Sequence, residues 1–315
     1  MRPCRGSARA VAALLLGSAA VPILAPVAGA STASPAVCSS SSRPALAARL
    51  TRDILAAQRG RVSAVAVGID DPGMGMTCWL NGSQHFDSAS VVKVTILGAL
   101  LRKAEDQHRN LTRNEAALAT AMITRSDNNA ASALWAELGR PYLQHFLNLA
   151  QMSQTALGPG GYWGLTQITA HNEVFLLRLL LHPNSVLGTV SRSYALNLMA
   201  HVIPSQRWGV PVGAPTGVTV KNGWLPRTAH GWRIHSIGCF TGRGGGYSIA
   251  VLTQDNASMA YGVATVEAIA RVINRDLNAG ITAPTPSSLF RRGVDRGPTR
   301  THRLPRPSPG ASPSR

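Results

Sequence analysis

Lysine is scarce in this 315-residue chain, although the chain is strongly basic. Of its 31 basic residues only three are lysines, Lys93, Lys103 and Lys221, and the others are arginines. Arginine keeps its proton in proteins, whereas burial lowers the pKa of a lysine by as much as several units. Because the chain uses arginine wherever a fixed positive charge is enough, the three lysines are candidates for a chemical role.

Acidic residues are also few, 14 against 31 basic ones, and the net charge is +17. A nucleic-acid partner would explain such an excess, but seven of the arginines lie in the C-terminal segment 282–315, which is rich in proline, serine and threonine. A segment of that composition buries no core and is expected to be disordered. We therefore expect no nucleic-acid partner. The tail is expected either to contact anionic cell-wall polymers or a membrane surface, or simply to be solvated.

The sequence has no cluster of metal ligands, no phosphate-binding loop and no internal repeat, so we expect no metal and no cofactor. Its one long apolar stretch lies near the N-terminus, after three arginines and before Ala28-Gly29-Ala30, which fits a cleavage site. This pattern predicts a signal peptide over residues 1–30. A transmembrane anchor is the competing interpretation, but Pro22 and Pro26 interrupt the stretch. The mature protein is therefore expected to be secreted, with cell-wall association as a further option.

Cysteine is sparse as well. Four cysteines are present, and three remain after the predicted cleavage. Export permits disulfides, and an odd number leaves one thiol unpaired. We predict that Cys38, in an N-terminal arm over residues 31–42, is bonded to Cys78, and that Cys239 is buried in a strand.

The pattern of apolar residues predicts one domain over residues 43–281. A helix over 43–58 is followed by a β-hairpin over 61–82, and a helical block runs from residue 88 to about 203. Three strands within 217–254 and a helix over 259–277 complete the order. We predict an α/β (α+β) fold, in which a five-stranded antiparallel sheet is flanked by the terminal helices and an all-helical lobe is inserted. A ligand is expected to bind in the cleft between sheet and lobe.

The stretch FDSASVVKVTIL places Lys93 in an apolar run at the predicted start of a helix over 90–104. Ser90 is three residues earlier and lies on the same helical face, whereas Ser88 is better placed to cap the helix. A lysine among valines is desolvated, which favours the neutral form that acts as a base. The alternative is a lysine that extends to solvent.

Two further motifs place polar groups beside the predicted cleft. Ser126-Asp127-Asn128 stands at a helix start, where a simple N-cap is the alternative. Lys221-Asn222-Gly223 stands on a strand, where the glycine lets a substrate lie along the strand edge and leaves the N–H of Trp224 free to donate. An exposed lysine on an edge strand is the alternative there.

Together, these three motifs resemble the S-x-x-K, S-D-N and K-T-G motifs of class A β-lactamases and penicillin-binding serine hydrolases. The resemblance covers roughly residues 43–280. It implies the following roles: Ser90 as nucleophile, Lys93 as base, Ser126 as proton relay, Asn128 as ligand of the acyl side chain, Lys221 as ligand of the substrate carboxylate, and the N–H groups of Ser90 and Trp224 as oxyanion hole.

The sequence departs from that family in the segment that normally carries the deacylating glutamate. The corresponding loop, TALGPGGYWGLTQIT, contains no acid, and Glu137 and Glu173 are the only carboxylates between Asp127 and Lys221. The acyl-enzyme is therefore expected to persist, unless Glu173 approaches from the next helix. The segment between the first two motifs is also short, which predicts an open cleft.

The third motif departs as well, because Asn222 replaces the usual Thr or Ser. Its amide can still bind a carboxylate, and Arg207 is a candidate second ligand, with a plain surface arginine as the alternative. Overall the sequence predicts a monomeric, exported serine hydrolase that acts by acyl transfer on β-lactams or related amides, with a small-molecule β-lactam or a peptidoglycan peptide as its partner. Alternatives are a D,D-peptidase with a long-lived acyl-enzyme, and a non-catalytic protein that binds cell wall or β-lactam.

Overall fold

The computed structural model describes residues 37–215, 217–241 and 245–279. The predicted signal peptide, residues 31–36 of the N-terminal arm and the basic tail lie outside these residues. Within them, no helix has the length and apolar character needed to cross a membrane.

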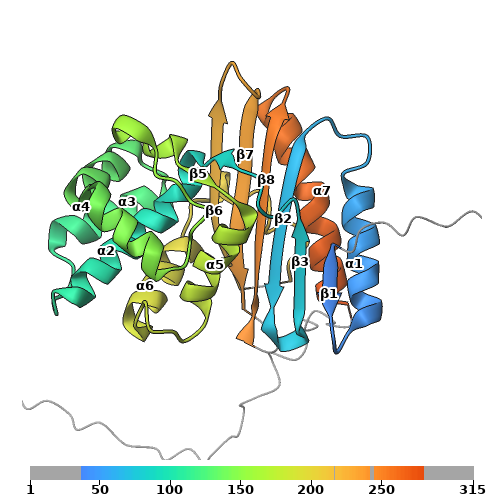
Figure 1. The fold of residues 1–315 in the computed structure, drawn as a ribbon, viewed down its shortest axis with the longest axis horizontal. Helices are drawn as coiled ribbons and strands as arrows, with labels where there is room; N and C mark the ends of the chain where they lie inside the picture. Colours follow the sequence, from blue (N-terminus) through green and yellow to red (C-terminus); the bar gives the residue numbers. More distant parts are fainter. Residues whose placement is uncertain (1–36, 216, 242–244, 280–315) are drawn as a thin grey trace, which may run out of the picture. The chain divides into compact units, whose positions relative to one another are not determined.

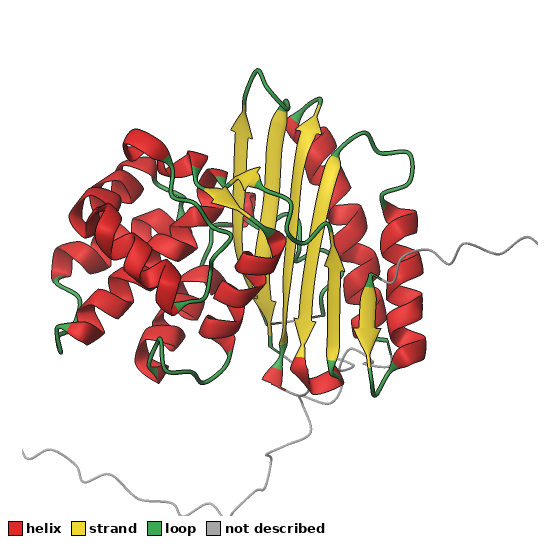
Figure 2. Ribbon diagram, in the orientation of Figure 1, coloured by secondary structure: helices red, strands yellow, loops and turns green. Residues whose placement is uncertain are grey.

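The described core is built on one antiparallel sheet in the order β1-β3-β2-β8-β7-β6. Both ends of the chain contribute strands, as predicted, and the α/β class and the layered arrangement are confirmed (Figure 2). The sheet has six strands instead of five, because the N-terminal arm adds a short edge strand beside β3. The strands are β1 (Cys38–Ser40), β2 (Ala64–Asp71), β3 (Met76–Leu80), β6 (Val218–Pro226), β7 (Trp232–Phe240) and β8 (Tyr247–Asn256).

Two terminal helices cover one face of the sheet, α1 (Pro44–Ala57) and α7 (Met259–Leu277) (Figure 1). On the other face, α5 (Ala170–Leu181) packs on β2 and β8 and leads into the helical lobe. The predicted inserted lobe is therefore present. Its helices are α2 (Val92–Asp106), α3 (Arg113–Thr124), α4 (Asn128–Leu149) and α6 (Thr189–Ala200).

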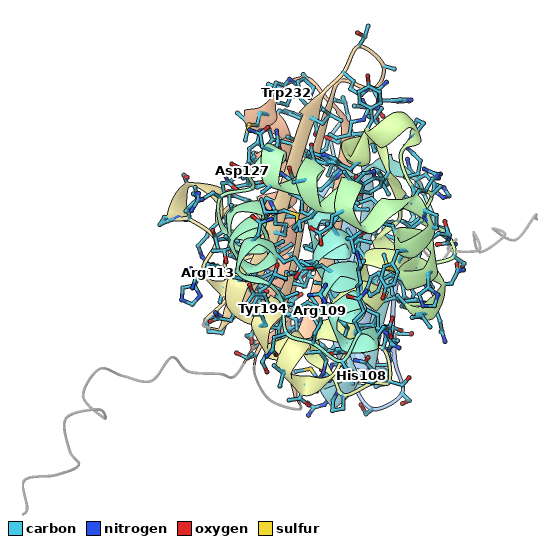
Figure 3. All side chains as sticks on the ribbon, turned by 90° about the vertical axis from the view of Figure 1, so that its left-hand side faces the viewer. His108, Arg109, Arg113, Asp127, Tyr194 and Trp232 are labelled. Atoms are coloured by element: carbon cyan, nitrogen blue, oxygen red, sulfur yellow. A yellow bond between two sulfur atoms is a disulfide. The ribbon has the colours of Figure 1, made fainter. Side chains whose placement is uncertain are left out.

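Local sequence signals set the helix boundaries in the lobe. A capping box at Thr112 and Glu115 begins α3, with both reciprocal hydrogen bonds present. Asp127 caps α4 by accepting a hydrogen bond from the N–H of Ala130, and Figure 3 labels it where that helix begins. Gly139, with φ 70°, interrupts α4 and divides it into two helical halves.

A two-stranded sheet connects the lobe to the main sheet. It pairs β4 (Phe86–Asp87) with β5 (Gln167–Ile168), and next to it the N–H of Ser88 donates to the carbonyl of Thr166 at 2.8 Å. The carbonyl of Asp87 accepts a 2.9 Å hydrogen bond from Nε2 of His235 on β7. These bonds fix the segment before α2 between the sheet and the loop that precedes β5.

The predicted disulfide is present, and the predicted free thiol is buried. Cys38 is bonded to Cys78 and pairs with it across β1 and β3, while Cys239 is free and buried in β7. Because 40 residues separate the two cysteines, breaking the bond releases considerable chain entropy in the unfolded state.

We expect the double variant Cys38→Ser/Cys78→Ser to lose about 3–4 kcal/mol of unfolding free energy, as measured by urea denaturation. The matched control is Cys239→Ser, which keeps the disulfide and should lose stability under reducing conditions as the wild type does, whereas the double variant should not respond to reductant. A double variant as stable as the oxidised wild type would contradict the expectation.

Candidate active site

Ser90 lies at the junction of sheet and lobe and lines a cavity of about 700 Å³. It belongs to a single 3-10 turn, Ala89–Val91, that precedes α2, and not to the α-helix itself, which begins at Val92. Ala89 has the unusual φ of 48°, a conformation that costs energy in a non-glycine residue and is often kept at functional sites. Ser88 is fully buried and donates its hydroxyl to backbone carbonyls. Of the two serines, Ser90 is the accessible one.

Ser126 lies between two lysine ammonium groups. Its hydroxyl oxygen is 3.1 Å from Nζ of Lys93 and 2.9 Å from Nζ of Lys221. Lys93 also donates to the carbonyl of Ser126 at 2.6 Å and to Oδ1 of Asn128 at 2.8 Å. Three segments far apart in the sequence, α2, the start of α4 and β6, therefore meet around one hydroxyl.

Both lysines are fully buried. Burial lowers the pKa of Lys93 to about 8, an effect that the nearby Asp127 carboxylate partly opposes. Burial and the positive charge of Lys93 hold the pKa of Lys221 well below its usual value. Since two desolvated ammonium groups repel each other, one of them gives up its proton readily, and the site contains a base in the physiological pH range.

The register of β6 turns the N–H of Trp224 toward the open edge of the sheet. Thr241 N donates to the carbonyl of Gly217, and Arg227 N donates to that of Gly231, at the two ends of the β6–β7 ladder. Bonded pairs alternate with non-bonded pairs in an antiparallel ladder, so the pair of Trp224 and Ile234 is non-bonded. The N–H of Trp224 is therefore free of β7 and faces the cavity that Trp224 helps to line.

Gly223 lets this edge of β6 approach the turn that carries Ser90. A Cβ atom at this position would lie 2.9 Å from the nitrogen of Ser90 and 3.0 Å from that of Val91. The approach places two backbone N–H groups, of Ser90 and Trp224, on the same side of the cavity. Such a pair can stabilise an oxyanion that forms beside the Ser90 hydroxyl.

We expect Gly223→Ala to separate the two N–H groups and lower the rate of any acyl transfer at Ser90 by about 100- to 1000-fold, the usual cost of one lost oxyanion donor. The matched control is Gly82→Ala, whose added Cβ would make only ordinary contacts of 3.5 Å with Trp79. Acylation kinetics measure the effect, and a Gly223→Ala variant that reacts as fast as the control would contradict it.

A family model described as the β-lactamase enzyme family matches residues 114–277, just over half of the chain. The chain belongs to this family. The matched region includes the S-D-N and K-N-G segments and all of the strands from β6 to β8. No curated protein sequence matches the chain.

Solved structures of the family share the fold of this β-lactamase-family protein. A class A β-lactamase representative from Bacteroides cellulosilyticus aligns with a TM-score of 0.64 at 18% identity, over 73% of this chain and 98% of that chain. A β-lactamase from Sphaerobacter thermophilus aligns with a TM-score of 0.61 at 19% identity, over 72% and 96%. At such low identity these likenesses show the fold, and the resemblance to class A β-lactamases is confirmed at that level.

Two predicted ligands of the substrate do not point into the cavity. Asn222 is fully buried on the opposite face of β6 from Lys221, and its amide donates to the carbonyls of Gln206 and Trp208 at 2.9 Å each. Alternation along a strand causes this, because neighbouring side chains point to opposite faces. Arg207 donates to the carbonyls of Ala200 and Val218. The structure therefore contradicts a free amide at Asn222, and it gives Arg207 backbone partners rather than a place in the cavity lining.

No acidic side chain is among the residues described as lining the cavity. Glu173 lies fully buried in α5, and burial raises its pKa to about 8. Neither of its oxygens has a hydrogen-bond partner among the described residues. Burial and the neighbouring Glu115 carboxylate raise the pKa of Glu137, which is also not among the described residues that line the cavity. The alternative that Glu173 approaches Ser90 from the next helix has no support here, because Glu173 is fully buried in α5 and is not among the described residues that line the cavity.

Sequence reasoning missed the residues that hold the loop before β5 over the site. Trp163 places its ring 4.8 Å from Nζ of Lys93, and its Nε1 donates to the hydroxyl of Ser132 at 3.1 Å. The Asp87 carboxylate accepts from Gln167 at 2.6 Å and pairs with Arg233 at 2.8 Å. The signal available in the sequence is a tryptophan in a glycine-rich loop, GPGGYWG.

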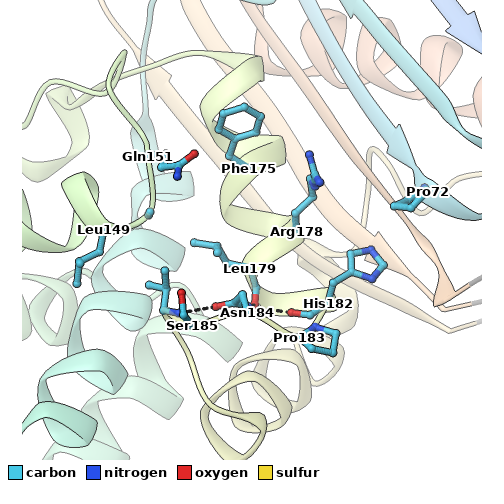
Figure 4. A pocket seen from close by; sticks show the side chains of 12 residues that line it. Pro72, Leu149, Gln151, Phe175, Arg178, Leu179, His182, Pro183, Asn184 and Ser185 are labelled. Carbon is cyan, nitrogen blue, oxygen red and sulfur yellow. Dashed lines mark hydrogen bonds between the residues drawn. The ribbon is translucent and has the colours of Figure 1, made fainter.

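A second cavity, of about 480 Å³, lies beside the C-terminal end of α5 (Figure 4). Arg178 and His182 line it, and Arg178 is paired with Asp70 at 3.2 Å. Its lining includes Ser185 but no lysine. It lacks the pairing of a serine with a desolvated base, so the cavity at Ser90 is the candidate active site.

Proposed function

We propose that this protein is an exported active-site-serine hydrolase that transfers acyl groups from β-lactams or related peptide amides to Ser90. Membership of the β-lactamase enzyme family and the class A fold support a hydrolase of this general type. The observation that carries the proposal is the hydroxyl of Ser126, which lies within 3.1 Å of the ammonium groups of both Lys93 and Lys221 beside the accessible Ser90.

In the proposed acylation step, the hydroxyl of Ser90 attacks the substrate carbonyl and loses its proton to Lys93 in its neutral form. The oxyanion accepts hydrogen bonds from the N–H groups of Ser90 and Trp224. Ser126 donates its hydroxyl proton to the leaving nitrogen and receives a proton from Lys221 in return. Lys221 also attracts the substrate carboxylate. Asn128 is placed to bind the acyl side chain, since it lines the same cavity.

Release of the acyl group is proposed to be slow. A deacylating water needs a base, and the described lining of the cavity offers no carboxylate for that purpose. This feature favours the second candidate function, a D,D-peptidase or penicillin-binding protein with a long-lived acyl-enzyme. A purely binding role is less well supported, because binding alone requires neither the serine nor two buried lysines.

Further parts of the proposal concern location and state. The signal peptide over residues 1–30 would direct export, and the basic segment 282–315 would then meet anionic polymers of the cell wall or remain solvated. The protein would act as a monomer, without metal or cofactor.

The proposal is tested by mixing the protein with benzylpenicillin and following both intact mass and loss of the β-lactam. We expect the mass to rise by one penicilloyl group and the adduct to persist through many minutes. Rapid loss of penicillin without an adduct would identify a true β-lactamase with fast release. Neither adduct nor turnover would contradict acyl transfer from β-lactams and favour a binding protein.

A further inference from the structure

Trp163 covers the lysine that the proposed mechanism uses as a base. The centre of its ring is 4.8 Å from Nζ of Lys93, a distance at which the face of an indole attracts a cation. The residue lies in the loop before β5, on the side of Lys93 that faces the cavity, and it also lines that cavity. Lys93 is thereby enclosed between the ring and the polar atoms of the S-D-N segment.

The Lys93 ammonium donates three hydrogen bonds, all to residues of the S-D-N segment. They are donated to the carbonyl of Ser126, the hydroxyl of Ser126 and Oδ1 of Asn128, at 2.6, 3.1 and 2.8 Å. No hydrogen bond joins Lys93 to Ser90 among the described residues. The positively charged form of Lys93 is therefore the form that this arrangement stabilises.

The ring is held in place at several points. Its Nε1 donates to the hydroxyl of Ser132 on α4 at 3.1 Å. The backbone carbonyl of Trp163 accepts a hydrogen bond from the hydroxyl of Ser88 at 3.3 Å and another from the N–H of Thr166 at 3.0 Å. These contacts tie the loop both to the turn that carries Ser90 and to the helix that carries Asn128.

We propose that Trp163 is a positioning residue, whose indole ring keeps the Lys93 ammonium turned toward Ser126 and Asn128 and thereby controls how readily Lys93 takes the proton of Ser90. The inference rests on the proposed function for its consequence in acylation. The interaction between ring and ammonium exists whether or not a β-lactam is the substrate.

Few charged groups face Lys93, so an effect of the ring can be isolated. Burial lowers the pKa of Lys93 and the Asp127 carboxylate before α4 opposes this, while the positive charge of Lys93 lowers the pKa of Lys221 on β6. The other charged residues of α2 lie near its C-terminal end, far along the helix from Lys93. In the loop 158–166 the one titratable side chain is Tyr162, which is 68% exposed. Replacing Trp163 by leucine keeps Lys93 shielded by an apolar side chain but removes the electron-rich ring face.

The chain has only three lysines, so their side-chain signals can be titrated individually by NMR in protein labelled with ¹³C-lysine. Lys103→Arg and Lys93→Arg variants assign the signals. In Trp163→Leu we expect the pKa of Lys93 to fall by about 0.5–1.5 units, the equivalent of one desolvated cation–π contact. Trp163→Phe, which keeps a ring but loses the bond to Ser132, should shift it by less than half as much.

The matched control is Tyr162→Leu, which changes the neighbouring residue of the same loop and should leave the pKa of Lys93 unchanged. An unchanged or raised pKa in a Trp163→Leu protein that melts at the wild-type temperature would overturn the inference. The acid limb of the pH profile for acylation by benzylpenicillin should move in parallel with the NMR value. If the NMR shift occurs but no variant is acylated, the proposed function fails while the role of Trp163 stands.

Discussion

Replacing Lys93 by methionine is expected to lower the rate of acylation of Ser90 by about 100- to 10,000-fold, the usual contribution of a positioned general base. Methionine fills a similar volume but accepts no proton. In the wild-type protein, the rate of acylation should rise as the pH passes the pKa of Lys93, about 8, because only the neutral amine removes the serine proton. The variant should lose this rise, and stopped-flow measurement with a chromogenic cephalosporin follows both effects.

Lys93→Arg separates the loss of a base from the loss of a charge. Arginine preserves the positive charge but does not release its proton, so this variant should be as slow as Lys93→Met. Lys103→Met serves as the matched control, because Lys103 lies near the far end of α2 and donates to the carbonyl of Glu137, its one side-chain partner among the described residues. A Lys93→Arg variant that retains most of the wild-type rate would exclude Lys93 as the base.

Glu173→Gln is expected to stabilise the protein by about 3–5 kcal/mol above pH 8. Burial raises the pKa of Glu173 to about 8 in the folded state, whereas in the unfolded chain it has its ordinary value of 4.5. The unfolded state therefore loses this proton first, and the folded protein loses stability as the pH rises from about 4.5 to 8. Glutamine has nearly the same shape as the protonated acid and does not titrate, so it removes the loss.

Urea unfolding of wild type and Glu173→Gln between pH 4 and 9 measures this effect. The two proteins should be nearly equal in stability at pH 4 and diverge as the pH rises. Glu105→Gln is the control, since Glu105 is a partly exposed residue on α2 that accepts a hydrogen bond from Gly188. Equal pH profiles for wild type and Glu173→Gln would show that Glu173 ionises normally in the folded protein.

Much of the fold follows from local sequence patterns. The three late strands carry dense apolar residues between short turns, and the helices carry recognisable caps, such as the Thr112 capping box and the Asp127 N-cap. The strand β1 was not predicted, because its three residues, Cys-Ser-Ser, carry no apolar alternation. Its place depends on pairing with β3 and on the disulfide at Cys38, which are long-range contacts.

In the site, too, local motifs identify some residues, whereas others depend on long-range contacts. Scarcity of lysine directed attention to Lys93 and Lys221, and the structure brings both to the hydroxyl of Ser126. The direction of Asn222 was misjudged, although strand alternation alone would have separated it from Lys221. The contact between Trp163 and Lys93 joins residues 70 positions apart, and it depends on how the loop before β5 folds back, which no local pattern specifies.

The surroundings of Ser90 also decide which serine of the pair in FDSASVVKVTIL reacts. Ser88 is fully buried, and both acceptors of its hydroxyl are backbone carbonyls. Ser90 lines the cavity together with Trp224, on the turn that leads directly into the helix of Lys93. The central claim, acyl transfer to Ser90, can therefore be tested at the level of a single residue.

The most direct measurement is to locate the adduct after exposure to benzylpenicillin, by proteolysis and tandem mass spectrometry of wild type, Ser90→Ala and Ser88→Ala. We predict one penicilloyl group on Ser90 in the wild type and in Ser88→Ala, and none in Ser90→Ala. An adduct that persists in a folded Ser90→Ala protein, or that maps to another residue in the wild type, would contradict the assignment of Ser90 as the nucleophile.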